Sequence, residues 1–322
     1  MSTPDLTARD PNLHVLNTHG LTTHDLNGRA PGKGTPAAPG APAPRRRGRP
    51  AGGGRPRAVS RAYRAELHKL RRPGTAIAMG ALAALSTLST VLSFALADDG
   101  PPTFDDPTSL LPPLPALATP AGLVLGFRAG STFTGMLLLV LCAAMVATEY
   151  GQGTIRVIFM REPRRVSWLA GRMAAVTGLL AVALVGAFLL SAATAILMAQ
   201  IRGVDTGQWW TAAAMRQVGK DYLNVLVATT FFAIAGTALG LLIRSTTTAV
   251  LVGVVWTFPL EHIIQNAWLD ATSWLPGLVF TDIATGGNAV SGYRGPLLLG
   301  IGYAVAFAVA GATSLARRDV TA

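Results

Sequence analysis

Long apolar runs alternate with short polar connections along the chain. Charged residues are absent from five runs of at least 20 residues, at 73–97, 129–148, 173–201, 222–243 and 295–316. A sixth run, 245–267, has the same character apart from Glu261. Because roughly 20 residues of helix cross a hydrocarbon core of about 30 Å, each run is long enough to span a membrane. The pattern predicts an all-α membrane protein with six transmembrane helices, at about 75–97, 129–148, 173–200, 222–243, 246–267 and 296–316.

The composition supports this fold class. Half of the 322 residues are hydrophobic and 13% are charged, which is about half the charged share of an ordinary soluble domain. The single cysteine, Cys142, lies inside the second apolar run. We expect it to pack in the interior, and it has no second thiol with which to form an intrachain disulfide.

Lys and Arg are distributed unevenly between the two sides of such a bundle. With six spans, 22 basic residues fall on the side that holds both chain ends, and 5 fall on the other side. Because basic residues are enriched in cytoplasmic connections, both termini are predicted to be cytoplasmic. The expected location is the cytoplasmic (cell) membrane, which the chain crosses several times.

The first 58 residues differ from the rest of the chain. They contain PGKGTPAAPGAPAPRRRGRPAGGGRPR, which is rich in Pro, Gly and Arg and has too little apolar surface to fold. We expect 1–58 to be a disordered cytoplasmic tail and 59–322 to form one six-span domain. On a chain tethered to a membrane, basic clusters more commonly bind anionic lipid headgroups than DNA. Membrane lipids are therefore expected partners, and nucleic acid is not.

The segment before the first span, SRAYRAELHKLRRPG at 60–74, combines basic residues with an apolar stripe. Tyr63, Leu67 and Leu70 are spaced by four and three residues, so they share one face of a helix. This pattern predicts an amphipathic helix that lies along the cytoplasmic membrane surface. A plain basic flank of the first span would explain the charges but not the stripe.

The connections on the other side suggest little folded structure. Residues 98–127 are acidic and then proline-rich, which favours an extended loop. Trp209 and Trp210 are placed as expected for an aromatic belt at the membrane surface. The half-apolar segment 266–296 is too short and interrupted to cross twice, so it favours a re-entrant or interfacial segment.

The connection between the second and third spans is unusually rich in charge. ATEYGQGTIRVIFMREPRRVSW, at 147–168, carries two carboxylates, four arginines and two glycines. Glu149 and Tyr150 fall at the end of the second span if its helix continues past the membrane surface. Gly151 and Gly153 permit a sharp turn that other residues would resist.

A short helix is predicted after this turn. Thr154 is a suitable cap for the helix IRVIFMRE, in which Ile155, Ile158 and Phe159 share one face. The helix is ended by Pro163 and followed by Arg164 and Arg165. The expected result is a compact, basic helix–turn–helix on the cytoplasmic face, with a carboxylate and glycines that topology alone does not require.

The quoted residues resemble a known family. EYGQGTIR, followed by REPRR, resembles the Glu-Tyr-x-x-Gly-Thr-(Ile/Leu)-Arg … Pro-x-Arg pattern of the permease subunits of type-2 ABC transporters of the export type. The resemblance extends from about residue 60 to the end. It includes ELHKLRR before the first span, which matches the pattern Glu-Leu-x-Lys-Leu-Arg at Glu66, Leu67, Lys69, Leu70 and Arg71.

The resemblance implies roles for individual residues. Glu149, Gly153, Thr154 and Arg156 are implied to belong to a coupling element that docks on a separate ATPase subunit. The chain has no acceptable phosphate-binding loop of its own, so ATP and Mg are expected on that partner and no cofactor is expected in this chain. A second permease copy or a relative is the other implied partner. We expect Glu149 to pair with Arg64 or Arg71 of the pre-span helix.

Glu261 is the one carboxylate well inside an apolar run, directly after Pro259. A charge in lipid is costly and usually faces protein or water. Three interpretations follow: a place on the substrate path, a buried structural bond to Arg294 or a neighbouring helix, or simple proximity to an outer boundary marked by Trp268. Pro259 removes a backbone hydrogen bond and is expected to bend the span.

These features favour the membrane-spanning subunit of an ATP-driven exporter, which is not an enzyme by itself. A membrane-embedded enzyme would need several polar residues converging at membrane depth, and the spans contain few. A membrane anchor that recruits partners through its basic tail would not need the helix–turn–helix. The transported substrate is not encoded in any motif of the sequence.

Overall fold

A computed structural model describes residues 55–70, 73–97, 112–161, 165–268, 271, 273–288 and 291–317. Most of the predicted tail, 1–54, lies outside the described residues. Residues 55–58 were assigned to the tail, but they belong to the first helix, which begins at Arg55.

Within the described residues the fold is all-α, with one isolated β-bridge between Asn288 and Gly292. The helices of the first half are α1 (Arg55–Leu70), α2 (Pro73–Ala95), α3 (Leu114–Leu117), α4 (Gly122–Ala129), α5 (Ser131–Gly151), α6 (Thr154–Arg161) and α7 (Arg165–Arg202). Those of the second half are η1 (Gly207–Trp210), α8 (Ala212–Ile243), α9 (Thr246–Val255), η2 (Trp256–Leu260), α10 (Glu261–Ala267), α11 (Pro276–Thr285) and α12 (Arg294–Arg317).

The described part of the chain holds six helices that are long and apolar enough to cross a membrane, so the predicted number of spans is confirmed. They are Pro73–Ala95, Gly122–Gly151, Arg165–Arg202, Ala212–Ile243, Thr246–Ala267 and Arg294–Arg317. The third span is much longer than predicted. Its 38 residues extend over about 57 Å at 1.5 Å per residue, well beyond a hydrocarbon core of about 30 Å.

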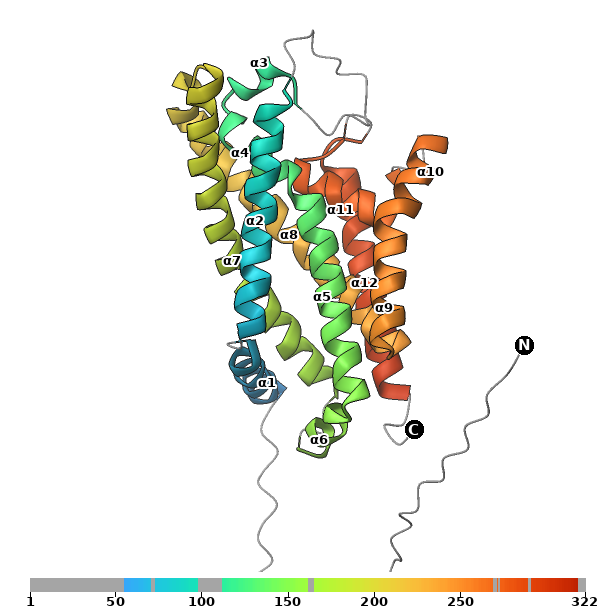
Figure 1. The fold of residues 1–322 in the computed structure, drawn as a ribbon. Coiled ribbons are helices and arrows are strands. Elements are labelled where there is room, and N and C mark those ends of the chain that lie inside the picture. Colours follow the sequence, from blue (N-terminus) through green and yellow to red (C-terminus); the bar gives the residue numbers. More distant parts are fainter. Residues whose placement is uncertain are drawn as a thin grey trace, which may run out of the picture. The chain divides into compact units, whose positions relative to one another are not determined.

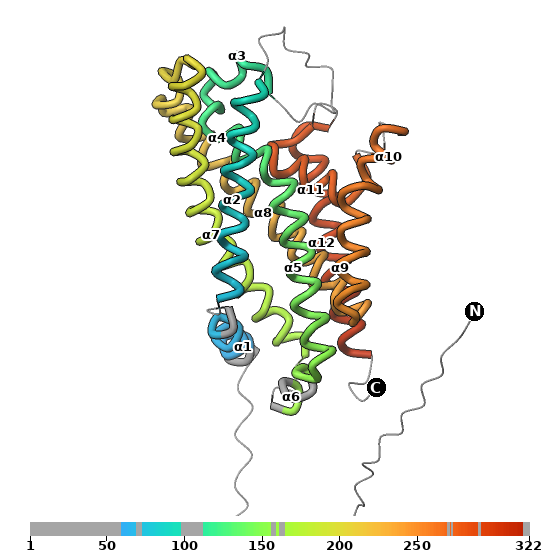
Figure 2. The backbone as a smooth tube through the Cα atoms, viewed as in Figure 1, coloured from blue at the N-terminus to red at the C-terminus, as the bar shows by residue number. Residues whose placement is uncertain are grey.

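The spans pack side by side, with short helices at both ends of the bundle (Figure 1). Helices α1 and α6 lie at one end, which we call the α6 end. Helices α3, α10 and α11 lie at the other, which we call the α11 end. The path of the chain from α9 into α10 can be followed in the tube of Figure 2.

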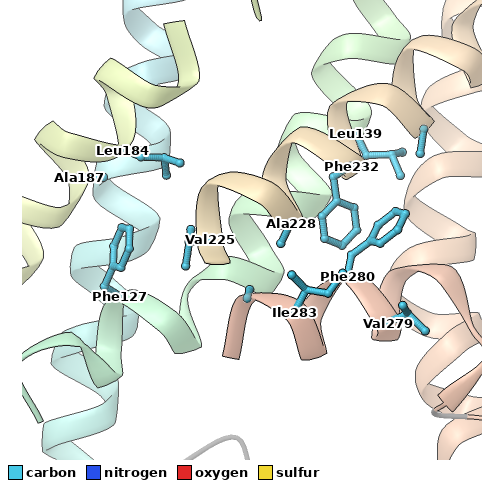
Figure 3. Packing of buried hydrophobic residues seen from close by; sticks show 12 residues of the cluster. Phe127, Leu139, Leu184, Ala187, Val225, Ala228, Phe232, Val279, Phe280 and Ile283 are labelled. Atoms are coloured by element: carbon cyan, nitrogen blue, oxygen red, sulfur yellow. The ribbon is translucent and has the colours of Figure 1, made fainter. Parts of the chain in front are cut away.

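Helix α8 forms the centre of the packing. The largest apolar cluster joins its Val225, Ala228 and Phe232 to residues of α4, α5, α7 and α11 (Figure 3). Phe232 meets Phe280 of α11 edge to face, with ring centroids 5.1 Å apart. A side chain at Gly236 would overlap with the backbone of Leu139 on α5, so this glycine permits close contact between α8 and α5.

The fifth span is irregular at the place predicted. Trp256–Leu260 forms a π-helical turn between α9 and α10, and Pro259 lies inside it. A proline without an N–H cannot continue the normal hydrogen-bond ladder, and a π turn accommodates that loss.

Two predictions for the α11 end are wrong. Trp209 is fully buried and its Nε1 donates to the carbonyl of Leu117 over 2.9 Å, so it is not part of an aromatic belt, whereas Trp210 is exposed. The expected extended loop 98–127 contains α3 and α4 in its described part, from residue 112 onward. Local composition did not reveal Trp209 as an anchor, because its partner lies far away in sequence.

Candidate functional site

The turn after the second span depends on one glycine. Helix α5 continues through Glu149 and Tyr150 to Gly151, as expected. Gly153 has φ +67° and donates its N–H to the carbonyl of Tyr150 over 3.0 Å. Because L side chains rarely adopt this conformation, the turn requires glycine at 153. Gly151 is the last residue of α5 and has no such conformation, so the prediction that both glycines form the turn is corrected.

Helix α6 follows the turn directly and is held by apolar contacts. It begins at Thr154, and Ile155 is buried to 1% exposure. Phe159 packs edge to face on Trp168 of α7 with centroids 5.6 Å apart. The side chain of Arg156 and the whole of Pro163 and Arg164 lie outside the described residues.

Arg165 joins this region to the last span. It is the first residue of α7, and its guanidinium stacks over Phe159 at 5.5 Å. Its Nη1 donates to the carbonyl of Leu315 over 2.8 Å. The last carbonyls of a helix lack partners within the helix, so a cation is well placed there. Arg165 therefore connects α6, α7 and the end of α12.

A buried arginine lies behind this layer. The Nη1 of Arg172, on α7, is 2.8 Å from an Oε2 of Glu149 and 3.5 Å from an Oε2 of Glu66. The side chains of Arg172 and Glu66 are 2% and 4% exposed, and that of Glu149 is 15% exposed. The guanidinium also lies 5.5 Å from the ring centre of Trp168. We call Glu66, Glu149 and Arg172 the charge hub; it joins α1, α5 and α7.

The hub contains an ion pair of Glu149 that was not predicted. We expected Glu149 to pair with Arg64 or Arg71, but Arg64 is exposed and Arg71 lies outside the described residues. The cation of the hub comes from the third span, and α1 contributes the carboxylate of Glu66. Arg172 precedes an apolar run, so in the sequence it looked like one more basic residue of the connection.

Helix α1 packs firmly against α7. Ala62 and Glu66, four residues apart, are buried at this contact. A Cβ at Gly171 would lie 2.5 Å from the Cβ of Ala62, so only glycine permits the approach. The packed face is therefore centred on Ala62 and Glu66, next to the predicted stripe. Tyr63 and Leu67 of that stripe are half-buried, and the side chains of Lys69 and Leu70 lie outside the described residues.

Tyr150 connects the same region to the turn between α8 and α9. The guanidinium of Arg244 lies 4.7 Å above its ring. Arg244 caps α8 in the left-handed conformation, with φ 59°. Two residues earlier in α5, the hydroxyl of Thr148 is 3.2 Å from that of Thr246 at the start of α9. The end of α5 thus contacts α7, the end of α8 and the start of α9.

Glu261 caps a helix at the α11 end. It is fully buried, and its two carboxylate oxygens accept hydrogen bonds from the N–H groups of Gly277 and Leu278, each over 3.0 Å. A carboxylate is stabilised at a helix N-terminus by these donors and by the helix dipole. The geometry favours the structural-bond interpretation, with the N-terminus of α11 as partner in place of Arg294.

A second set of polar contacts lies at the α11 end, and no pattern in the sequence predicted it. Arg128 of α4 lies 3.6 Å from Asp221 of α8 and also donates to the carbonyl of Thr285 at the end of α11. Nearby on α11, Asp282 accepts from Asn288 over 2.7 Å. Burial raises the pKa of Asp282 to about 6, and the Asn288 hydrogen bond partly offsets that rise. Within the described residues no three His, Cys, Asp or Glu side chains are grouped to hold a metal.

Comparison with known proteins identifies one matching family. No curated protein matches the chain. Residues 126–321 match a family described as "Protein of unknown function (DUF2705)". The matched region runs from α4 to the end of the last span, so it includes Glu149, Arg172 and Glu261. Since the match covers more than half of the chain, the protein belongs to the DUF2705 family.

Proposed function

We propose that this chain is the membrane-spanning permease subunit of an ATP-driven ABC exporter, and that α6 is the coupling helix that docks on a separate ATPase subunit. The observation that carries the proposal is the charge hub, which joins the end of α5, just before the turn into α6, to α1 and α7. Sequence resemblance at EYGQGTIR and REPRR supports the same role.

The contacts around α6 suit the transmission of force. A helix that merely connected two spans would need no buried ion pair, and burying three charges is costly unless they are paired. Here α6 is fastened through Phe159 to α7, and α7 is fastened through Arg165 to α12. A displacement of α6 would therefore be transmitted to several spans at once, which is what a rigid-body movement of these spans requires.

The proposal specifies the partners and the location. ATP and Mg belong to the partner ATPase, and this chain supplies the translocation path with a second copy or a relative. The α6 end faces the cytoplasm of a cell membrane, which agrees with the excess of Lys and Arg in the connections on that side.

Co-purification tests the proposal. The tagged full chain is extracted in mild detergent from its native membrane, and the associated proteins are identified by mass spectrometry. Met160 is 76% exposed on α6, so Met160→Asp should remove the ATPase from the complex. Met215, exposed at the start of α8, offers the matched control Met215→Asp, which should retain it.

Two results would contradict the proposal. One is the absence of any ATPase from the wild-type complex. The other is labelling of residues 149–161 from outside intact cells, which would place α6 on the wrong side of the membrane.

A further inference from the structure

The two halves of the fifth span are held differently. The first half, α9, packs against α5 and α8. Gly253 permits this approach, because a Cβ there would lie 2.7 Å from a methyl carbon of Leu139. The second half, η2 and α10, packs mainly on itself and on α9, and α10 lies at the edge of the bundle (Figure 1). We call this second half, residues 256–267, the strap.

A narrow line of residues on the fifth span is buried. Between 246 and 268, where every residue is described, the buried residues are Ala249, Gly253, Thr257 and Glu261. A step of four residues exceeds one α-helical turn of 3.6 residues, so such a line drifts around a regular helix. A π turn has more residues per turn and offsets this drift. The π turn at Trp256–Leu260 therefore helps to keep Glu261 facing α11.

The remaining sides of the strap have few neighbours. Trp256, Phe258 and Ile263 are 44%, 45% and 63% exposed. The ring of Phe258 lies near that of Phe133 on α5, with centroids 6.1 Å apart. The strongest contact of the strap with another helix is the pair of hydrogen bonds that Glu261 accepts from the N-terminus of α11. Because charge-assisted bonds are stronger than neutral ones, this side chain is the main attachment of the strap.

Glu261 is suited to hold the strap reversibly. Within the part of the chain that the structure describes, no Lys or Arg pairs with it. Its charge is balanced by two N–H donors and by the dipole of α11. Both oxygens bind the same helical turn, so a small movement of α10 breaks both hydrogen bonds together.

The π turn is suited to act as a hinge. Pro259 lies inside it and has no N–H, so the hydrogen-bond ladder of the span is already interrupted there. Sharp bends in long helices occur at prolines and at π turns. Bending at this place therefore costs less than bending within α9, which is a regular α-helix.

We propose that the strap is a movable element of the fifth span, with its hinge at the π turn and its latch at Glu261. In the released form α10 moves away from the N-terminus of α11, and Thr257 and Glu261 become accessible, while α9 stays packed on α5. The inference goes beyond the transport function. It concerns this chain alone, so its test requires neither an ATPase nor a transported substrate.

Distances between spin labels in the full chain test this movement. The labels are placed at Ile263 on the strap and at Leu223 on α8, which are both exposed, in a Cys142→Ala background. The protein is reconstituted in nanodiscs, and labelled chains are diluted into unlabelled ones so that only distances within one chain are measured. With the latch intact, one main distance is expected, and the released form should appear as a second distance.

Glu261→Gln should increase the released population about tenfold, which corresponds to about 1.4 kcal/mol. The amide has the same shape as the carboxylate, but it presents an NH2 group to one of the two N–H donors. Gly277→Ala disturbs the latch from the α11 side and should reproduce the effect. The test therefore does not depend on the stability of a single variant.

Two controls separate the latch from a general loosening of the span. His262→Gln changes the neighbouring residue, whose ring bonds to a carbonyl within the strap itself, so the distances should stay unchanged. A label at Leu251, exposed on α9, is paired with the label at Leu223 and should report the same distance in every variant.

Two outcomes would overturn the proposal. One is an unchanged distance distribution for Ile263 in both Glu261→Gln and Gly277→Ala. The other is a change for Leu251 as large as that for Ile263, because the whole span would then loosen and the π turn would not be a hinge.

Discussion

Arg172 and Glu149 form a hydrogen-bonded ion pair of 2.8 Å between the third and second spans, at the end of the bundle that carries α6. Removing one member of a buried pair leaves the other charge uncompensated, which costs about 3–5 kcal/mol. Arg172→Met should therefore lower the thermal unfolding temperature of the purified protein markedly. Arg64→Gln removes an exposed charge of α1 and should change stability by less than about 0.5 kcal/mol. Equal stability of the two variants would contradict a structural role for the hub.

The hub should also be needed for coupling. Glu149→Gln keeps an acceptor but removes the charge that holds the guanidinium, so the ATPase should still bind and hydrolyse ATP while the spans no longer respond. The response is measured as the distance between spin labels at Ile201 and Trp268, exposed residues at the α11 end, in a Cys142→Ala background. An ATP-dependent distance change as large as in the wild type would show that coupling does not depend on this carboxylate.

The two glycines before α6 should respond differently to alanine. At Gly153, with φ +67°, a side chain in the left-handed conformation costs about 1–2 kcal/mol. Gly151 is helical with open space around it, so Gly151→Ala should be neutral or stabilising by about 0.5–1 kcal/mol. Thermal unfolding of the matched pair measures the difference, and a destabilised Gly151→Ala would contradict the assigned turn.

The cap of α11 should not tolerate a side chain at Gly277. A Cβ there would overlap with Oε2 of Glu261, so Gly277→Ala should break one or both capping hydrogen bonds. The expected loss is about 1–3 kcal/mol, since a buried carboxylate is left with fewer donors. Gly302→Ala, on α12 with open space, is the control. Faster hydrogen exchange of α11 in Gly277→Ala alone would support the cap, and equal exchange in both variants would refute it.

Asp282 should make stability depend on pH. Its pKa is raised by burial from 3.8 to about 6, so the folded state binds more protons than the unfolded state between these values. The stabilisation is therefore complete below about pH 4 and decreases as the pH rises to about 6. Asp282→Asn resembles the neutral acid and can still accept from Asn288. Its unfolding temperature relative to the wild type should rise between pH 4 and pH 7, and a constant difference would contradict this assignment.

The spans could be predicted from the sequence because hydropathy is a local property. The runs around Leu82 or Val305 are apolar whatever their neighbours are, and helix length follows from the membrane thickness. The hub could not be predicted, because Arg172 acquires its role only when the fold brings Glu66 and Glu149 to it. Trp209 and Arg128 illustrate the same limit: both are fixed by a carbonyl from a distant segment, and no local pattern encodes such a partner.

Helix α7 extends over about 57 Å and carries Arg165 and Arg172 near one tip. A helix of this length amplifies small rotations when it turns as one body. A tilt of about 10° about its midpoint then moves each tip by about 5 Å. A modest displacement of the arginine-bearing end would thus move Ile201, at the other end, by the width of a side chain.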